Sequence, residues 1–282
     1  MVLDDFASIV AVCGDEGTGK TTMALTFPKP LKHLDIDVGG YRRAAWRLDT
    51  TDTTTKSYPM PIQLDKLKGQ VTVSTRIQVP KKVEGMKNMW QDIVTDFVEA
   101  CQDAALKTIV LDSSTLLWNI CHKSVLEEIQ ERQLARHKKE HPNQQFDEND
   151  YRERLQPIEY GPANDRMRTL LHTARSFNKN LVLVHYPTDE YGSMPDGKGG
   201  MADAKTGNII IDGFKETKKL VDLVVWASVK DTAFAGVTSK QPAAKITKCG
   251  IENMGLSALG LEIPATYEAI INLKNLMSGE QV

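Results

Sequence analysis

The chain has 282 residues, of which 41% are hydrophobic and 26% charged, and its formal net charge is -2. These values are ordinary for globular proteins and exclude a disordered or fibrous chain. With a pI near 6.3, the molecule lacks the strongly basic field that draws a whole protein surface onto nucleic acid, so any such contact is expected to be local. The length predicts a single α/β domain over residues 1–282.

Cysteine spacing and the N-terminus bear on the compartment. No C-x-x-C spacing occurs, which argues against a zinc site or a disulfide framework; the four cysteines are Cys13, Cys101, Cys121 and Cys249. The first residues carry two acids where a signal peptide needs a basic start, and no apolar run approaches the roughly 20 residues of a membrane span. We therefore expect a cytoplasmic protein with no membrane contact.

Strand and helix patterns alternate along the first half of the chain. The run 7–13 is apolar and β-branched and stops at Gly14, which is typical of a buried parallel strand. Further strands are expected at 31–37, 71–79 and 107–112, and helices at 20–27, at 89–106 and after Asp112.

The second half continues the alternation with two interruptions. A helical and polar insertion is expected at about 118–160, and the segment 187–208 is rich in Gly, Asp and Pro without periodicity, which predicts a long loop. A helix over 164–177 and strands at 180–186, 223–229 and 243–249 complete the pattern. The whole predicts a mostly parallel sheet covered by helices on both faces.

Residues 14–21, GDEGTGKT, satisfy G-x-x-x-x-G-K-[ST] between a predicted strand and a predicted helix. In such a loop the glycines let backbone N–H groups face phosphate oxygens, the lysine binds the β/γ-phosphates, and the hydroxyl can ligate Mg²⁺. The expected contacts to ATP are Gly14, Asp15, Glu16, Gly17, Thr18, Gly19, Lys20, Thr21 and Thr22, with Thr21 also at the metal. A glycine-rich turn that binds nothing is the alternative.

Three polar residues follow other predicted strands. Asp112 ends TIVLD and is expected to hold Mg²⁺ with Thr21, although an acid there also suits a helix N-cap. LDID offers Asp35 and Asp37, of which Asp37 is better placed to orient the attacking water. His185 ends NLVLVH and is expected to sense the γ-phosphate, the alternative being an ordinary histidine at a strand end.

The order and spacing of GDEGTGKTTMAL, HLDIDVGG, TIVLDSST and NLVLVHY resemble the RecA-like recombinase core over roughly residues 7–250. The resemblance implies a RecA-like P-loop fold, the catalytic carboxylate role for Asp37, and a strand end at NLVLVHY that relays the γ-phosphate state to a DNA-binding loop. It also matches Lys248 with a lysine that reaches a neighbouring subunit's ATP.

More narrowly, the early phosphate loop and YGPANDRMRTLL resemble the phage ATPases grouped as RecA-like single-strand annealing proteins. This resemblance implies weak ATP hydrolysis, stimulated by DNA, in phage or bacterial DNA recombination. The implied partners are single-stranded DNA, further copies of the chain in a ring or filament, and a single-strand-binding protein.

Two segments are candidate DNA contacts. The expected loop 187–208 and the residue before it offer aromatic and basic side chains of the kind that single-strand binding needs, namely Tyr186, Tyr191, Lys198 and Lys205. The basic stretch 132–139 is the second candidate. A mobile surface loop and a solvated helix face are the respective alternatives.

Two other functions remain compatible with the phosphate loop. A small-substrate kinase would share the architecture but predicts an arginine-rich lid, and no such cluster is obvious in the sequence. A nucleotide-dependent interaction protein with little hydrolysis is the other.

Overall fold

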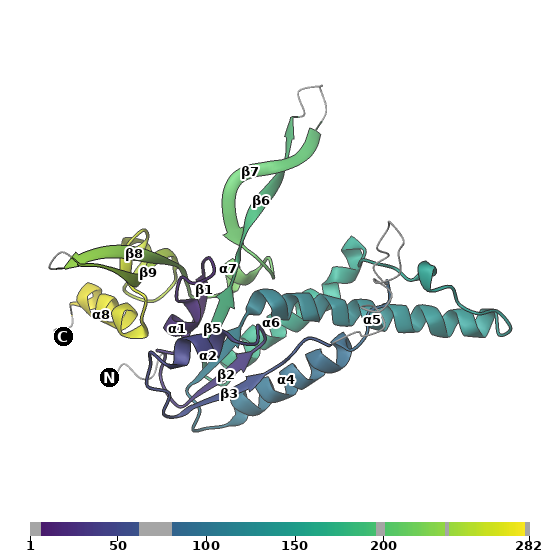
Figure 1. Cartoon of the computed structure of the whole chain (residues 1–282), viewed down its shortest axis with the longest axis horizontal. Helices are drawn as coiled ribbons and strands as arrows, with labels where there is room; N and C mark the ends of the chain where they lie inside the picture. Colours follow the sequence, from purple (N-terminus) through teal and green to yellow (C-terminus); the bar gives the residue numbers. More distant parts are fainter. Residues whose placement is uncertain (1–6, 62–80, 196–200, 235–236, 280–282) are drawn as a thin grey trace.

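The computed structural model describes residues 7–61, 81–195, 201–234 and 237–279. In this part of the chain one large sheet lies between layers of helices, and a two-stranded hairpin stands away from the sheet (Figure 1). No helix in these ranges combines the length and apolarity needed to cross a membrane. The expected strand at 71–79 lies outside the described residues.

The main sheet contains eight described strands. They are β1 (Ile9–Cys13), β2 (Leu31–Asp35), β3 (Thr53–Ser57), β4 (Thr108–Asp112), β5 (Asn180–His185), β8 (Leu223–Phe234), β9 (Val237–Cys249) and β10 (Glu262–Pro264). Their order is β10-β9-β8-β1-β5-β4-β2-β3; the β8–β9 and β9–β10 pairs are antiparallel and the other pairs are parallel. The sheet is therefore mostly parallel, as expected, with an antiparallel edge.

Pairing register aligns the carboxyl ends of the parallel strands. Cys13 of β1 lies opposite His185 of β5, and Asp35 of β2 lies opposite Asp112 of β4. The connections that follow these strand ends meet at one edge of the sheet, where open α/β sheets bind ligands.

Both faces of the sheet are covered by helices. These are α1 (Lys20–Ala24), α2 (Gly40–Ala45), α4 (Met86–Gln102), α5 (Ser114–Glu140), α6 (Tyr160–Ser176), α7 (Thr217–Leu220) and α8 (Tyr267–Ser278), with short 3-10 turns at Glu148–Asp150, Pro157–Glu159 and Gly255–Ala258. The helices α2, α7 and α8 and the strands β3 and β10 were not predicted. β3 is short and threonine-rich and lies at the sheet edge, so it lacks the apolar run by which a buried strand is recognised.

The two cores follow the alternation of side chains along the strands. In β1, Ile9 and Ala11 pack toward α4, α5 and α6, whereas Val10 and Val12 pack toward α1, α2 and α8. Since both faces are buried, β1 is apolar at every position, as expected of a central parallel strand.

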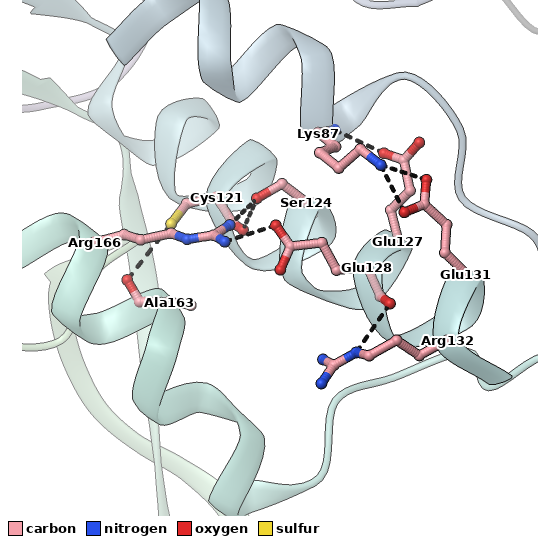
Figure 2. Close-up of polar contacts among 9 residues, drawn as sticks. All are labelled: Lys87, Cys121, Ser124, Glu127, Glu128, Glu131, Arg132, Ala163 and Arg166. Carbon is pink, nitrogen blue, oxygen red and sulfur yellow. Dashed lines mark hydrogen bonds and ion pairs between the residues drawn. The ribbon is translucent and has the colours of Figure 1, made fainter. Parts of the chain in front are cut away.

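Polar contacts tie α4, α5 and α6 into one layer (Figure 2). The Arg166 guanidinium of α6 donates to Ser124 Oγ at 2.8 Å and to Glu128 Oε1 at 2.7 Å on α5. The Glu127 carboxylate of α5 accepts from the backbone N–H groups of Gly85 and Lys87, at 2.9 and 2.7 Å, where α4 begins. The two bonds to Glu127 satisfy backbone N–H groups that have no partner within α4, because they lie at the start of the helix.

The expected insertion at about 118–160 continues α5 to Glu140 and then returns along it. Tyr151 and Leu155 are buried, and Gln130 Nε2 donates to the Arg152 carbonyl at 2.7 Å. The polar stretch is thus packed against α5.

The expectation of a long loop at 187–208 is wrong. The described residues form two antiparallel strands, β6 (Pro187–Pro195) and β7 (Met201–Ile211), which project from the domain (Figure 1). Nearly every β7 residue is exposed, so neither face of the strand has to be apolar. The sequence therefore lacks the alternation of apolar and polar residues by which a half-buried strand is recognised. A register shift between Asp189 and Tyr191 further interrupts the pattern.

Candidate nucleotide-binding site

The phosphate loop links β1 to α1. Gly17 and Gly19 have φ values of 77° and 88°, a region that favours glycine, and a Cβ on Gly19 would lie 3.2 Å from the Pro242 side chain. Lys20 begins α1 and is 7% exposed, with its Nζ donating to the Gly14 carbonyl at 2.7 Å and the Asp15 carbonyl at 2.6 Å. The loop is therefore already wrapped around its lysine.

The Lys20 ammonium lies among acids. Burial lowers its pKa, while Asp112 and other nearby acids, including Asp15 and Asp37, oppose the shift. Placed in this way, Lys20 is a positive charge whose present partners are neutral backbone carbonyls. Phosphate oxygens would be stronger acceptors for it, since charge-assisted hydrogen bonds exceed neutral ones.

Thr21 and Asp112 meet beside the loop. The Thr21 hydroxyl donates to Asp112 Oδ2 at 2.6 Å, and Gly40 comes so close that a Cβ there would lie 3.2 Å from both of these oxygens. The space next to the oxygen pair therefore depends on a glycine. Hydroxyl and carboxylate oxygens are the donors that Mg²⁺ prefers, so these residues fit the ion.

Among the described residues, no three His, Cys, Asp or Glu side chains converge on one metal position. An ion at Thr21 and Asp112 would accordingly take its other ligands from phosphate and water, as Mg²⁺ does at phosphate sites. The same Asp112 is followed by the N-cap of α5, but the capping side chain is Ser113, whose Oγ accepts from Leu116 N at 3.3 Å.

The two acids of LDID have different surroundings. Asp35 is buried and accepts from Gly39 N at 3.1 Å and Ser57 Oγ at 3.3 Å, which holds the turn after β2. Asp37 lies beyond the strand end and lines the cavity described below. The geometry thus favours Asp37 over Asp35 for contact with a bound molecule.

A cavity of about 300 Å³ opens beside the loop. It brings together most of the predicted nucleotide contacts, and its lining is Glu16, Gly17, Gly19, Lys20, Thr21, Thr22, Asp37, Gly40, Arg43, Ala44, Arg47, Asp112 and Tyr186. Sequence reasoning missed Arg43, which lies on α2, and Arg47, which follows the end of this helix. The signal was available, because YRRAAWR directly follows the predicted strand end LDIDVGG.

Tyr186 was predicted as a DNA contact, yet it closes this cavity. Its hydroxyl donates to Asp37 Oδ2 at 2.6 Å, and Lys20 Nζ lies 4.6 Å from its ring centroid. Burial, reinforced by the bond to Asp37, raises the pKa of the Tyr186 phenol, so it stays protonated and can donate. Tyr186 therefore contacts both the phosphate-loop lysine, Lys20, and the candidate base, Asp37.

His185 is fully buried and does not line the cavity. Its Nδ1–H donates to the Asp212 carbonyl at 3.0 Å, and its Nε2 has no partner in the described part of the chain. Burial lowers its pKa to about 4, against the opposing hydrogen bond to Asp212, so the imidazole is neutral near pH 7. In this geometry His185 makes no direct contact with the site, and Tyr186 is the strand-end residue that does.

Lys248 also has a different environment from the one implied by the resemblance. Its Nζ donates to the carbonyls of Lys218, Lys219 and Val221, at 2.7, 3.2 and 2.6 Å, where α7 ends. Burial lowers its pKa. The ammonium is therefore occupied within its own chain, and the structure gives it a helix-terminating role.

The candidate DNA contacts are dispersed. Tyr191 is 62% exposed on the hairpin, but Lys205 forms an ion pair with Asp189 at 2.5 Å. Lys198 lies outside the described residues. On α5, Arg136 pairs with Glu140 at 2.8 Å, so part of the basic stretch 132–139 is also neutralised locally.

A strand, a glycine loop with a buried lysine and a hydroxyl–carboxylate pair at the sheet edge define a P-loop nucleotide-binding protein with a mostly parallel α/β sheet. The chain belongs to the AAA domain family, whose model matches residues 7–248. Membership of this family indicates nucleotide binding.

The chain is similar to a KaiC-like protein from the hyperthermophilic archaeon Pyrococcus horikoshii, at 12% identity over 91% of this chain and 84% of that chain, with a TM-score of 0.41. No curated protein sequence matches the chain.

Proposed function

We propose that the chain is a Mg²⁺-dependent ATPase. The observation that carries this proposal is the convergence of Lys20, the Thr21–Asp112 pair and Asp37 on one cavity from three strand ends. Phosphate binding, metal binding and orientation of water are the functions that hydrolysis of a phosphoanhydride requires, and these side chains match them in that order.

The residues act as follows. Lys20 exchanges its bonds to the loop carbonyls for bonds to phosphate, and Thr21 and Asp112 hold the metal, which when bound polarises the phosphoryl oxygens as a Lewis acid. Asp37 orients the attacking water and accepts its proton. Tyr186 donates to Asp37 Oδ2 and so orients the carboxylate, whose oxygens keep lone pairs that can accept from water.

Phosphate release, measured with ATP in Mg²⁺ and in EDTA, tests this function. The wild type is expected to hydrolyse ATP only with Mg²⁺, and Thr21→Val is expected to lose most of the Mg²⁺-dependent rate. Thr95→Val on the exposed face of α4 is the matched control, because it removes the same hydroxyl far from the cavity. Equal Mg²⁺-dependent rates of phosphate release in Thr21→Val and the control would contradict the proposal.

Nucleotide state is proposed to reach the β6–β7 hairpin through Tyr186. This residue lies between β5 and β6, its N–H donates to Thr115 Oγ1 at 3.1 Å, and its carbonyl accepts from Asp212 N at 2.9 Å at the base of the hairpin. A shift of the ring away from Lys20 would therefore move both strands at their root. Hydrogen exchange over 187–211 should change with ATP in the wild type and much less in Tyr186→Phe, while no change in the wild type would refute the coupling.

Single-stranded DNA is the proposed partner of the hairpin, in phage or bacterial recombination and strand annealing. Exposed Tyr191 and the root of the hairpin at the nucleotide site support this proposal. Anisotropy of a labelled oligonucleotide, with ATP, with ADP and without nucleotide at two salt concentrations, should show salt-sensitive binding that depends on nucleotide. Binding in no state would exclude it. Assembly into rings or filaments stays a prediction, which light scattering with and without ATP checks.

A nucleotide-dependent protein-interaction role is the second candidate, because one observation favours it. The described hairpin carries Asp189, Glu190 and Asp203 against Lys205, together with exposed Met201 and Ile209. An acidic and apolar ribbon suits a basic protein surface better than a phosphate backbone. ATP-dependent capture of a protein partner without DNA affinity would select this function.

A further inference from the structure

The Asp112 carboxylate has a second neighbour behind the cavity. His33, on β2, is completely buried, and its Nε2 lies 3.4 Å from Asp112 Oδ2, the same oxygen that accepts from Thr21 at 2.6 Å. Since a carboxylate oxygen only accepts, Nε2–H is the donor. One carboxylate oxygen is thus contacted from the phosphate loop on one side and from the core on the other.

The backbone and α2 hold the imidazole in place. His33 and Asp35 are two residues apart on β2, so both side chains lie on the face covered by α1 and α2. The Tyr41 ring stacks on the imidazole, with centroids 5.4 Å apart and planes 30° apart. The position of Nε2 is therefore set by the strand and by Tyr41, independently of any bound nucleotide.

Packing alone does not explain a histidine at this position. His33 Nδ1 has no hydrogen-bond partner in the part of the chain that the structure describes, and the same holds for the buried Asp35 Oδ1 and Thr55 Oγ1 nearby. Thr55 pairs with His33 in the β2–β3 register. A buried polar atom without a partner costs stability, and an apolar side chain would avoid that cost. The contact with Asp112 is what an apolar residue could not supply.

We propose that His33 is a positioning residue for the magnesium site. By donating to Asp112 Oδ2 from the buried side, it fixes the rotation of the carboxylate and keeps it directed at the space beside Thr21 and Gly40. The proposal rests on the assignment of Asp112 to Mg²⁺ under the proposed function. Partners that orient a ligating carboxylate typically contribute about 10- to 100-fold to metal affinity.

The test compares nucleotide affinity with Mg²⁺ and in EDTA, using a fluorescent ATP analogue, for the wild type, His33→Phe and His33→Gln. Phenylalanine keeps the stack on Tyr41 without the donor, and the glutamine amide can restore the donor. We expect His33→Phe to raise the Mg²⁺ concentration needed for tight binding by about 10- to 100-fold, with unchanged affinity in EDTA. His33→Gln should recover most of this loss.

A purely structural role predicts a different pattern. It would lower the melting temperature of both variants and weaken binding equally with and without Mg²⁺. Equal Mg²⁺ dependence in His33→Phe and the wild type would overturn the proposal, and so would failure of His33→Gln to recover binding. If the wild type itself showed no Mg²⁺ dependence, the proposed function would fall first, so the two failures are distinguishable. His172→Gln, at an exposed position on α6, serves as the control.

Discussion

The phosphate-loop edge and the β6–β7 hairpin differ in how their polar groups are satisfied. At the edge, Lys20 and Asp112 are almost fully buried and bonded to defined partners from other elements. On the hairpin, Lys205 and Asp189 are exposed and form an ion pair with each other. A buried charge needs its partners in fixed positions, whereas an exposed pair is worth little, so only the edge has a geometry specified by the fold.

The two regions meet at Tyr186, which lines the cavity and begins the hairpin. The edge is accordingly expected to determine chemistry, and the hairpin to determine partner choice. Substitutions in one region should leave the function of the other region unchanged. The exception is a substitution of Tyr186, which belongs to both regions.

The largest expected effect is on hydrolysis at the edge. Asp37→Asn should lower the ATP turnover rate by about 10²- to 10⁴-fold, because a positioned general base contributes that much, while nucleotide affinity stays close to the wild type. Phosphate release and analogue binding measure the two quantities. Asp231→Asn, on the exposed part of β8, is the control. Normal turnover in Asp37→Asn would remove the assignment of this residue as the base and leave the rest intact.

The next effect concerns the buried strand end beside the site. Burial lowers the pKa of His185 to about 4, below the value of about 6.5 in an unfolded chain. Between these values the unfolded state binds one more proton, so stability is complete above pH 6.5 and falls as the pH drops toward 4. The difference amounts to about 3 kcal/mol.

Denaturant unfolding at pH 7 and pH 4.5, compared for the wild type and His185→Asn, isolates this contribution from the titration of the carboxylates. The variant should lose less stability on acidification than the wild type. The exposed His172→Gln should behave as the wild type does. An identical pH response in His185→Asn would show that the imidazole is not held neutral.

A smaller effect is expected on the hairpin. If DNA binds there, Tyr191→Ala should weaken single-strand affinity by about tenfold, since stacking of one base on an aromatic ring contributes roughly 1–3 kcal/mol. ATP turnover without DNA should not change, because Tyr191 lies outside the cavity. Oligonucleotide anisotropy and phosphate release check the two halves. Reduced turnover without DNA would contradict the separation of the two regions.

The smallest effect tests the role of Lys248. Lys248→Met keeps the aliphatic stem but removes three donations to the carbonyls at the end of α7. Since the ammonium is only partly buried, the expected loss in unfolding free energy is about 1 kcal/mol. Lys245→Met, exposed on the same strand, is the control. Lost ATP turnover at unchanged stability would instead support the subunit-bridging role implied by the RecA resemblance.

The sequence was most informative where burial constrains composition. The apolar runs of β1, β4 and β5 lie between helices, so both their faces are buried, and Asp112 at the end of β4 lines the cavity. The phosphate loop could be recognised from its residue types, because its backbone conformation requires glycines and its contact with phosphate requires a lysine. These features predicted the parallel sheet and placed Lys20, Thr21, Asp37 and Asp112 near one another.

The rest depended on contacts that no local pattern records. The β7 strand is exposed on both faces and therefore shows no apolar alternation, which is why it was predicted as a loop. The side chain of His185 points away from the cavity, and that of Tyr186 points into it, a distinction set by strand register and by the bond to Asp37. The intrachain partners of Lys248 could not be foreseen from the sequence, because these carbonyls of α7 lie about 30 residues away along the chain.

The most direct test of the account is binding of an ATP analogue to the wild type and Lys20→Ala, each with Mg²⁺ and with EDTA, together with a melting curve for each protein. We predict Mg²⁺-enhanced binding in the wild type, and a loss of at least about 100-fold in Lys20→Ala at an unchanged fold, because the charged donor to phosphate is gone. Equal affinity in the two proteins would contradict the assignment of the cavity as a nucleotide site.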